Sequence, residues 1–165
     1  MTPVGLWSRI VVGALLAIAL PLTLEIPPPT HLHASPALAL GAGLAVGTAL
    51  YSAVARRRLL PVRPAGVTRT AFIIGWATVE EILWRWLLLG GLALTIPTGA
   101  AFATATIAFA LTHAHGRRVH IGTGGTFGGL YLVTGTLLAP LVAHIVYNLL
   151  VAGSLSAARP EAQLG

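Results

Sequence analysis

Long apolar stretches follow one another along most of this chain, and they constrain its fold more than any other feature. A helix needs about twenty apolar residues to cross the roughly 30 Å hydrocarbon core of a bilayer. Six stretches are candidate spans, of which the fifth is short. They run from about 4 to 24, 35 to 55, 71 to 96, 98 to 113, 121 to 133 and 137 to 155. We therefore predict an all-α fold, a polytopic bundle of about six transmembrane helices.

The composition excludes the main alternatives to a membrane protein. Only 8% of the residues are charged, against roughly 25% in an ordinary soluble domain. A soluble domain of 165 residues exposes too much surface to be covered by so few charges. A disordered chain requires low hydrophobicity, which is not found here. The lipid bilayer is thus a predicted partner, and nucleic acid is not, despite a formal charge of +6.

Arginines lie almost entirely on one side of the predicted topology, because successive connections alternate between the two faces of the membrane. One face receives Arg9, Arg56, Arg57, Arg58, Arg63, Arg69, Arg117, Arg118 and Arg159. The connections on the other face contain none. Since positively charged loops stay in the cytoplasm, both termini are predicted to be cytoplasmic. The Ala-, Gly- and Arg-rich composition is associated with bacteria, so we predict a multi-pass protein of a prokaryotic plasma (inner) membrane.

The predicted spans form two groups and a tail. Residues 1–70 contain two accessory transmembrane helices and an arginine-rich cytoplasmic loop, residues 71–155 contain four further spans, and residues 156–165 form a cytoplasmic tail. The first stretch could also be a signal peptide with Arg9 as its basic start. We favour a retained helix, because no clean cleavage site follows it directly.

Three ionisable side chains, Glu80, Glu81 and Arg85, interrupt the third apolar stretch. Charged side chains at the bilayer centre cost about 2.5–3.5 kcal/mol each on insertion scales and are usually functional. Glu81 and Arg85 are four residues apart on one helical face, in the favourable order for an ion pair. Glu80 is rotated by about 100° from Glu81. We predict that Glu80 lacks this cation and is available for acid–base chemistry, with a purely structural bridge through Arg85 as the alternative.

Further polar side chains lie in the later stretches. His113 ends the fourth stretch, and His144 and Asn148 lie one turn apart on the same side of the last one. Together with Glu80 they would form a polar site if they converge. Straight helices would put His113 near the cytoplasmic face and His144 nearer the outer face, so convergence requires tilted or kinked helices. The remaining histidines are predicted to be solvated: His31, His33, His115 and His120.

Glycines recur in the second and fifth stretches. They are Gly43, Gly47, Gly124, Gly125, Gly128 and Gly129. Small residues four apart allow helices to approach closely in lipid. A phosphate-binding loop is the alternative, but no strand precedes these glycines and no lysine follows them. The spacing therefore predicts close helix packing.

The polar residues also match the motifs of a known family. Residues 80–85, EEILWR, resemble the EExxxR motif of the CPBP (Abi) family, which contains type II CAAX prenyl endopeptidases and bacteriocin-processing proteins. Residues 109–113 are similar to the family's FxxxH motif, and residues 144–148 to its HxxxN motif. The resemblance covers about residues 71–152. Three motifs in the same order inside apolar stretches form a specific signal.

This resemblance implies an intramembrane glutamic endopeptidase without a cofactor, with residues 71–155 as its catalytic core. The site residues it implies are Glu80, Glu81, His113, His144 and Asn148 in catalysis, with Arg85 and Phe109 in support. Glu80 would activate water, which His113 would help to hold and polarise. His144 and Asn148 would stabilise the oxyanion. The expected partner is a membrane-associated protein or peptide, cleaved near the membrane end of an anchored or lipidated precursor.

Two other functions stay open on the sequence alone. Glu80, His113 and His144 could bind Zn²⁺ with water in the fourth position, although no HExxH motif is present. A non-enzymatic membrane protein, such as an immunity or scaffold factor or a proton-coupled carrier, could use the same groups as a relay. The absence of duplicated halves argues against a carrier, and the cost of burying several ionisable groups argues against a scaffold.

Overall fold

The computed structural model describes residues 3–55, 66–113 and 116–157. Its elements are α1 (Pro3–Thr23), α2 (Pro36–Ala55), α3 (Val67–Glu81), the π-helical segment η1 (Ile82–Gly90), α4 (Gly91–Ala93), α5 (Thr98–Leu111), α6 (Arg117–Thr134) and α7 (Leu138–Ala157). The described ranges contain helices and no strand, so the all-α prediction is confirmed for them.

Six helical rods occupy the six apolar stretches, because α3, η1 and α4 form one continuous helix. The junction residues Ile82 and Gly91 both keep α-helical backbone angles. The rods follow the predicted bounds closely except at the starts of α3 and α6, which begin at Val67 and Arg117 rather than near residues 71 and 121. Gly116 and Gly135, both with positive φ, bound this helix at its two ends.

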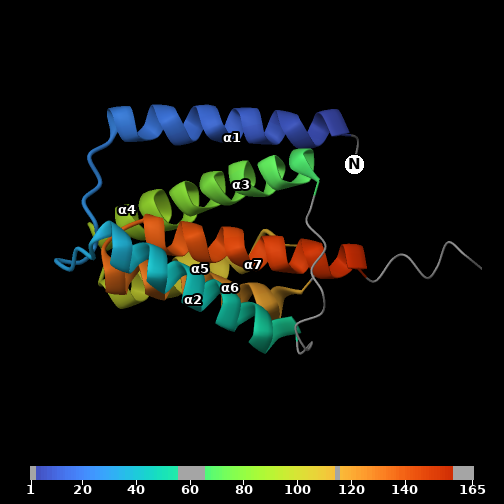
Figure 1. The fold of residues 1–165 in the computed structure, drawn as a ribbon. Coiled ribbons are helices and arrows are strands. Elements are labelled where there is room, and N and C mark those ends of the chain that lie inside the picture. The colour runs from blue at the N-terminus through green and yellow to red at the C-terminus, as the bar shows by residue number, and fades with distance from the viewer. Residues whose placement is uncertain (1–2, 56–65, 114–115, 158–165) are drawn as a thin grey trace, which may run out of the picture.

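Only part of the predicted membrane topology is supported by the helices themselves. Among the described helices, α2 alone is long and apolar enough, over Pro36–Val54, to cross a membrane by length and composition. Shorter apolar segments occur in α1, α5 and α7. The first helix begins and the last one ends at the same end of the bundle (Figure 1). Six crossings and cytoplasmic termini stay predictions, and residues 56–65 and 158–165, which include most of the predicted loop and tail, lie outside the described residues.

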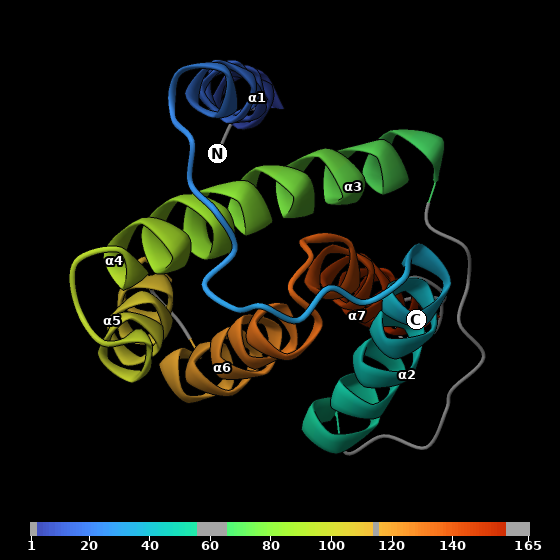
Figure 2. The same ribbon diagram turned by 90° about the vertical axis from the view of Figure 1, so that its left-hand side faces the viewer.

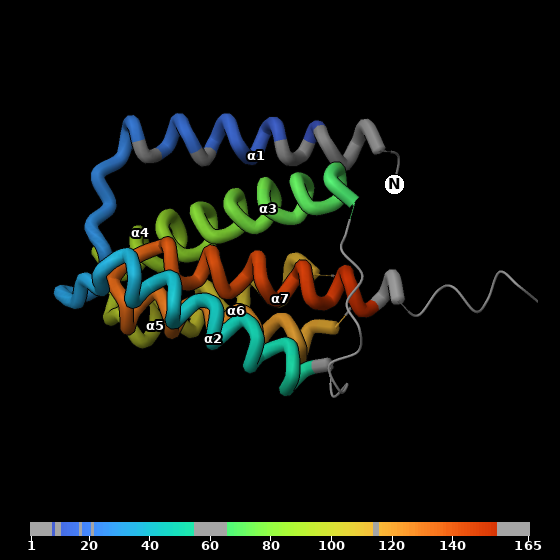
Figure 3. Tube along the Cα trace, in the orientation of Figure 1, coloured from blue at the N-terminus to red at the C-terminus, as the bar shows by residue number. Residues whose placement is uncertain are grey.

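The rods are not parallel to one another. In Figure 2, α1 and α7 are seen nearly end-on, whereas the long helix from α3 to α4 runs across the view. The trace in Figure 3 shows α7 between α3 and α2, with α1 at one edge of the bundle beside α3. Residues at the same distance from the ends of two helices can therefore lie at different depths in the bundle.

The glycine spacing in α2 produces its closest helix contact. A Cβ on Gly43 would lie 2.7 Å from the carbonyl oxygen of Ala139, and a Cβ on Gly47 would lie 2.6 Å from that of Ala143. Real Cβ atoms do not approach oxygen so closely, so the two backbones meet only because both positions are glycine. This contact confirms the predicted close packing and fixes α7 against α2.

Glycines of α6 accept aromatic rings of α5. A Cβ on Gly124 would lie 2.8 Å from the ring of Phe109, and one on Gly128 would lie 3.0 Å from that of Phe102. Gly129 has open space around its Cβ position, so close packing is wrong for this glycine. The helix therefore turns its Gly124 and Gly128 side toward α5, as the packing prediction requires.

The segment between α1 and α2 closes one end of the bundle (left in Figure 1). Its Ala34 N–H donates to the carbonyl of Thr134 over 2.8 Å, and its Ile26 carbonyl accepts from the Trp86 indole over 3.2 Å. Gly135 has φ +64°, and a Cβ there would overlap the backbone of this segment. The segment therefore covers the end of the bundle opposite to the one where α5 stops and α6 begins (Figure 1).

Candidate active site

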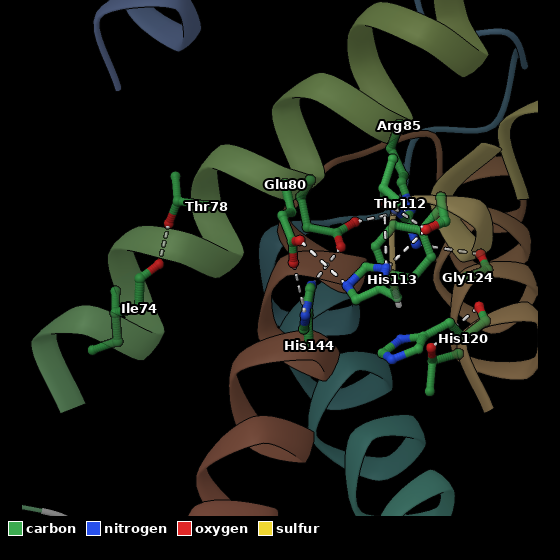
Figure 4. Close-up of polar contacts among 12 residues, drawn as sticks. Ile74, Thr78, Glu80, Arg85, Thr112, His113, His120, Gly124 and His144 are labelled. Carbon is green, nitrogen blue, oxygen red and sulfur yellow. Dashed lines mark hydrogen bonds and ion pairs between the residues drawn. The ribbon is translucent and has the colours of Figure 1, made fainter. Parts of the chain in front are cut away.

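Three rods bring the predicted ionisable residues to one place (Figure 4). Glu80 and Glu81 end α3, and Arg85 follows in η1. His113 lies just beyond the end of α5, and His144 lies in α7. π-Helical turns are rare and occur frequently at functional sites, and here one begins directly after the glutamate pair. The convergence that the sequence left conditional is therefore present.

Both carboxylate oxygens of Glu81 contact a nitrogen of another side chain. Its Oε2 lies 3.2 Å from Nε of Arg85, and its Oε1 lies 2.7 Å from Nδ1 of His144. The predicted ion pair is thus confirmed, although its alignment is not that of a hydrogen bond. An ionised carboxylate only accepts hydrogen bonds, so Nδ1 of His144 carries the hydrogen. In a neutral ring, Nε2 is then left as an acceptor.

Arg85 is held between aromatic rings. Its guanidinium carbon lies 4.8 Å from the ring centre of Phe109 and 5.6 Å from that of Phe127, and Nη2 donates to the carbonyl of Gly124 over 3.3 Å. Such cation–π contacts stabilise a desolvated cation. Phe109 therefore packs against the guanidinium, and its supporting role in catalysis stays a prediction. Phe127, which also stacks on His144 at 4.7 Å, was missed from the sequence because it belongs to no polar pattern.

Glu80 faces both imidazoles without bonding to either one. Its Oε1 lies 3.8 Å from Nε2 of His113, and its Oε2 lies 3.6 Å from Nε2 of His144. Both separations exceed hydrogen-bond length. Nδ1 of His113 donates to the Phe109 carbonyl over 2.8 Å, because a carbonyl can only accept. With both rings neutral, a carboxylate and two acceptor nitrogens converge, an arrangement that requires a shared proton or a donor placed among them.

A cavity of about 130 Å³ lies at this convergence. It is lined by Trp76, Glu80, Phe109, His113, His120, Thr123, Phe127, His144, Tyr147 and Asn148. Water occupies about 30 Å³ per molecule in the liquid, so the space admits water beside the carboxylate. The His113 side chain is 27% exposed and that of Glu80 is 9% exposed, so the cavity runs from a solvent-reached rim at His113 down to Glu80.

Straight helices gave different depths for His113 and His144, and the side chains reduce this difference. Glu80, on a helix that is strongly inclined to α7 (Figure 2), lies between the two imidazoles. The His113 ring folds back along α5 by one turn, where Nδ1 reaches the carbonyl of Phe109. The imidazole therefore lies deeper in the bundle than its own backbone.

His120 contradicts the prediction that it is solvated. Its half-buried ring stacks on that of His113, with centres 3.8 Å apart and planes inclined by 18°. The prediction is wrong because α6 begins earlier than expected. Gly116 before two arginines was the available signal for that start.

The other three histidines that the sequence predicted to be solvated are His31, His33 and His115. His31 and His33 are exposed as predicted, and His115 lies outside the described residues.

Among the described residues, no group of three or more His, Cys, Asp or Glu side chains could hold a metal ion. Zinc binding by Glu80, His113 and His144 stays an alternative prediction.

Fold and site together define an apolar protein, helical and without strands in its described ranges, with buried glutamate, arginine and histidine side chains beside a water-sized cavity. Residues 64–150 match the type II CAAX prenyl endopeptidase Rce1-like family. This match covers just over half of the chain and includes every site residue named above. The chain therefore belongs to this family. No curated protein and no solved structure matches it.

Proposed function

We propose that the chain is an intramembrane glutamic endopeptidase, which hydrolyses a peptide bond near the membrane end of a membrane-associated or lipidated precursor. The observation that carries this proposal is the convergence of Glu80, His113 and His144 on one cavity. Membership of an endopeptidase family supports the type of reaction. A scaffold would gain nothing from three unpaired acceptors around a water-sized space, whose burial is costly.

Glu80 acts as the base in this reaction. A water in the cavity donates hydrogen bonds to the Glu80 carboxylate and to Nε2 of His113, which orients its oxygen toward a substrate carbonyl. As that oxygen bonds to the carbonyl carbon, its proton passes to Glu80 and the carbonyl electron pair becomes an oxyanion. When the C–N bond breaks, Glu80 returns the proton to the leaving amine. The products are a carboxylic acid and an amine.

Asn148 and His144 stabilise the oxyanion in different ways. Asn148 lines the cavity from α7, and its amide donates hydrogen bonds without any change in protonation. His144 offers Nε2 as a donor only while the proton taken from water by Glu80 is passed on to that nitrogen, which lies 3.6 Å from Oε2 of Glu80. The carboxylate of Glu81 at 2.7 Å from Nδ1 stabilises the imidazolium formed, and the proton returns through Glu80 to the leaving amine. Each oxyanion donor contributes about 10²–10³ in rate. Glu81 is a positioning residue in this mechanism, because both of its oxygens face other side chains.

We also propose that all six rods cross a prokaryotic plasma membrane, with both termini in the cytoplasm. Large apolar side chains on the described helices are exposed, including Leu22 at 81% and Val133 at 68%, and lipid would cover them. α5 has 14 residues and spans about 21 Å, which is less than the hydrocarbon thickness. Its end at the cavity rim would then lie below the cytoplasmic surface, so that a water-filled recess leads to the site.

The proposal is tested with Glu80→Gln and with Glu25→Gln as its matched control. Both remove one carboxylate, but Glu25 is exposed in the segment between α1 and α2. Purified variants are reconstituted in liposomes with a set of membrane-anchored peptides, some of them prenylated, and products are identified by mass spectrometry. We expect Glu80→Gln to lose at least 10³-fold in kcat, in the range of essential catalytic groups, and Glu25→Gln to keep the native rate.

The same assay separates the alternatives. Native rates in Glu80→Gln would remove Glu80 from the mechanism. Loss of activity after chelation, together with stoichiometric zinc in the purified protein, would favour a metalloendopeptidase. Intact peptides with the native protein would favour a carrier or a scaffold.

A further inference from the structure

His113 has an imidazole that its own backbone holds only loosely. α5 ends at Leu111, and the His113 N–H donates to the carbonyl of Ala110 over a long 3.3 Å. The orientation of the ring must therefore be fixed by what touches it. Its ring contacts include the bond from Nδ1 to the Phe109 carbonyl and the Thr112 hydroxyl at 3.4 Å from the same nitrogen. Glu80 lies 3.8 Å from Nε2, and two rings pack against the imidazole, the tilted ring of Phe109 at 4.7 Å and the stacked ring of His120 at 3.8 Å.

His120 is attached to a more rigid element than His113. It lies in the first turn of α6, and its N–H donates to the carbonyl of Gly116 over 3.1 Å. Its carbonyl accepts from the Thr123 hydroxyl, and the edge of its ring meets Phe109 at 5.9 Å. Side chains on regular helices hold a site more firmly than side chains on loops. The His120 ring can therefore restrict the orientation of the His113 ring that stacks on it.

We propose that His120 is a positioning residue for the hydrolysis proposed above: its ring presses His113 against Phe109 so that Nε2 faces Glu80. The flat stack, inclined by only 18°, blocks rotation of the His113 ring toward the solvent at the cavity rim. Removing it frees the ring to turn away, so that the water bound between His113 and Glu80 loses its orientation. Because the proposal rests on the proposed function, its test includes a measurement that does not require activity.

The kinetic test compares His120→Ala, which removes the stacked ring, with His120→Phe, which keeps a flat ring but has no nitrogen. We expect His120→Ala to lower kcat about tenfold or more with KM unchanged, since misplacement by about 1 Å can cost 10²-fold. We expect His120→Phe to stay within about threefold of the native kcat. His33→Ala, at an exposed histidine of the α1–α2 segment, is the matched control and should keep the native rate.

Two kinetic results would contradict positioning by His120. A native kcat in His120→Ala would overturn the proposal. Equal losses in His120→Ala and His120→Phe would also overturn it, because the nitrogen atoms rather than the stacked ring would then be required.

The second measurement is ¹⁵N NMR of the imidazoles in histidine-labelled protein, with the His113 signals assigned by their loss in His113→Gln. Nitrogens with and without hydrogen have distinct shifts, so the spectrum reports the tautomer directly. The native protein and His120→Phe should show His113 with hydrogen on Nδ1 alone, and His120→Ala should show a mixture of tautomers. A single Nδ1–H tautomer in His120→Ala would refute positioning by His120. This readout stands even where no peptide is cleaved, so it fails separately from the proposed function.

Discussion

Removing the charge of Glu81 without removing its hydrogen-bonding atoms should reveal how strongly the site depends on one ion pair. Glu81 and Arg85 are 1% and 2% exposed, and their charged atoms lie 3.2 Å apart. In Glu81→Gln the amide oxygen can still accept the bond from His144, but Arg85 has no carboxylate left beside it. Its Nη1 already lacks a hydrogen-bond partner among the described residues. We expect a loss of about 3–5 kcal/mol in the free energy of unfolding, the usual cost of an uncompensated buried charge.

The double variant gives the sharper result. Arg85→Met alone should cost a similar amount, because it leaves the Glu81 carboxylate buried without its cation. Glu81→Gln combined with Arg85→Met removes both charges and keeps an apolar stem between Phe109 and Phe127. Replacing a whole buried pair by apolar groups is often close to neutral. The double variant should therefore be more stable than either single variant, with a coupling energy of at least about 3 kcal/mol.

Denaturant titration of the purified protein in detergent, followed by tryptophan fluorescence, measures these differences. Glu25→Gln and Arg118→Met are the matched controls, since both residues are exposed, and each should stay within about 0.5 kcal/mol of the native protein. Additive losses in the double variant would show that the two charges do not compensate one another. The interpretation of Glu81 as an anchor for Arg85 would then be wrong.

Two further predictions concern the closed end of the bundle and the oxyanion. Gly135→Ala should lower the free energy of unfolding by more than 2 kcal/mol, because it adds strain at φ +64° to a backbone overlap. Gly129→Ala, with open space around its Cβ, should raise the free energy of unfolding by about 0.5–1 kcal/mol. Equal effects of the two substitutions in thermal unfolding would contradict both predictions. Asn148→Ala should lower kcat about 10²–10³-fold with little change in KM, and a rise in KM alone would mean that Asn148 binds substrate rather than the oxyanion.

Sequence reasoning succeeded where the interacting residues share one helix. The Glu81–Arg85 pair follows from a spacing of four residues, and Glu80 was separated from it by simple rotation about the helix axis. The bond from His144 to Glu81 joins residues 63 positions apart and depends on how α7 packs against α3. The sequence predicted close glycine packing, which fixes α7 against α2, but no pattern in it gave the register of α7 against α3.

The failures have a common physical cause, which is the treatment of each span as a straight rod of hydrophobic length. α6 begins with Arg117 and Arg118, so an apolar criterion started it four residues late and left His120 in a solvated loop. The same criterion measured the depth of His113 from its backbone, whereas its ring folds back along α5. Polar residues in the first turn of a helix and side chains beyond its last turn escape any method that reads only apolar length.

The two adjacent glutamates have different roles, and their environments explain why Glu80 rather than Glu81 is the base. Glu81 lies between Arg85 and Nδ1 of His144, so taking up a proton would break an ion pair and leave Arg85 uncompensated. Glu80 has no cation at bonding distance, and both of its oxygens face acceptor nitrogens at 3.6 and 3.8 Å. A proton taken from water can be shared among the Glu80 carboxylate and the Nε2 atoms of the two neutral imidazoles. Protonating Glu80 therefore removes the repulsion between the carboxylate and the nitrogen lone pairs. The bond from Glu81 fixes the tautomer of His144 that makes Nε2 one of these acceptors, so the second glutamate prepares the surroundings in which the first can accept a proton.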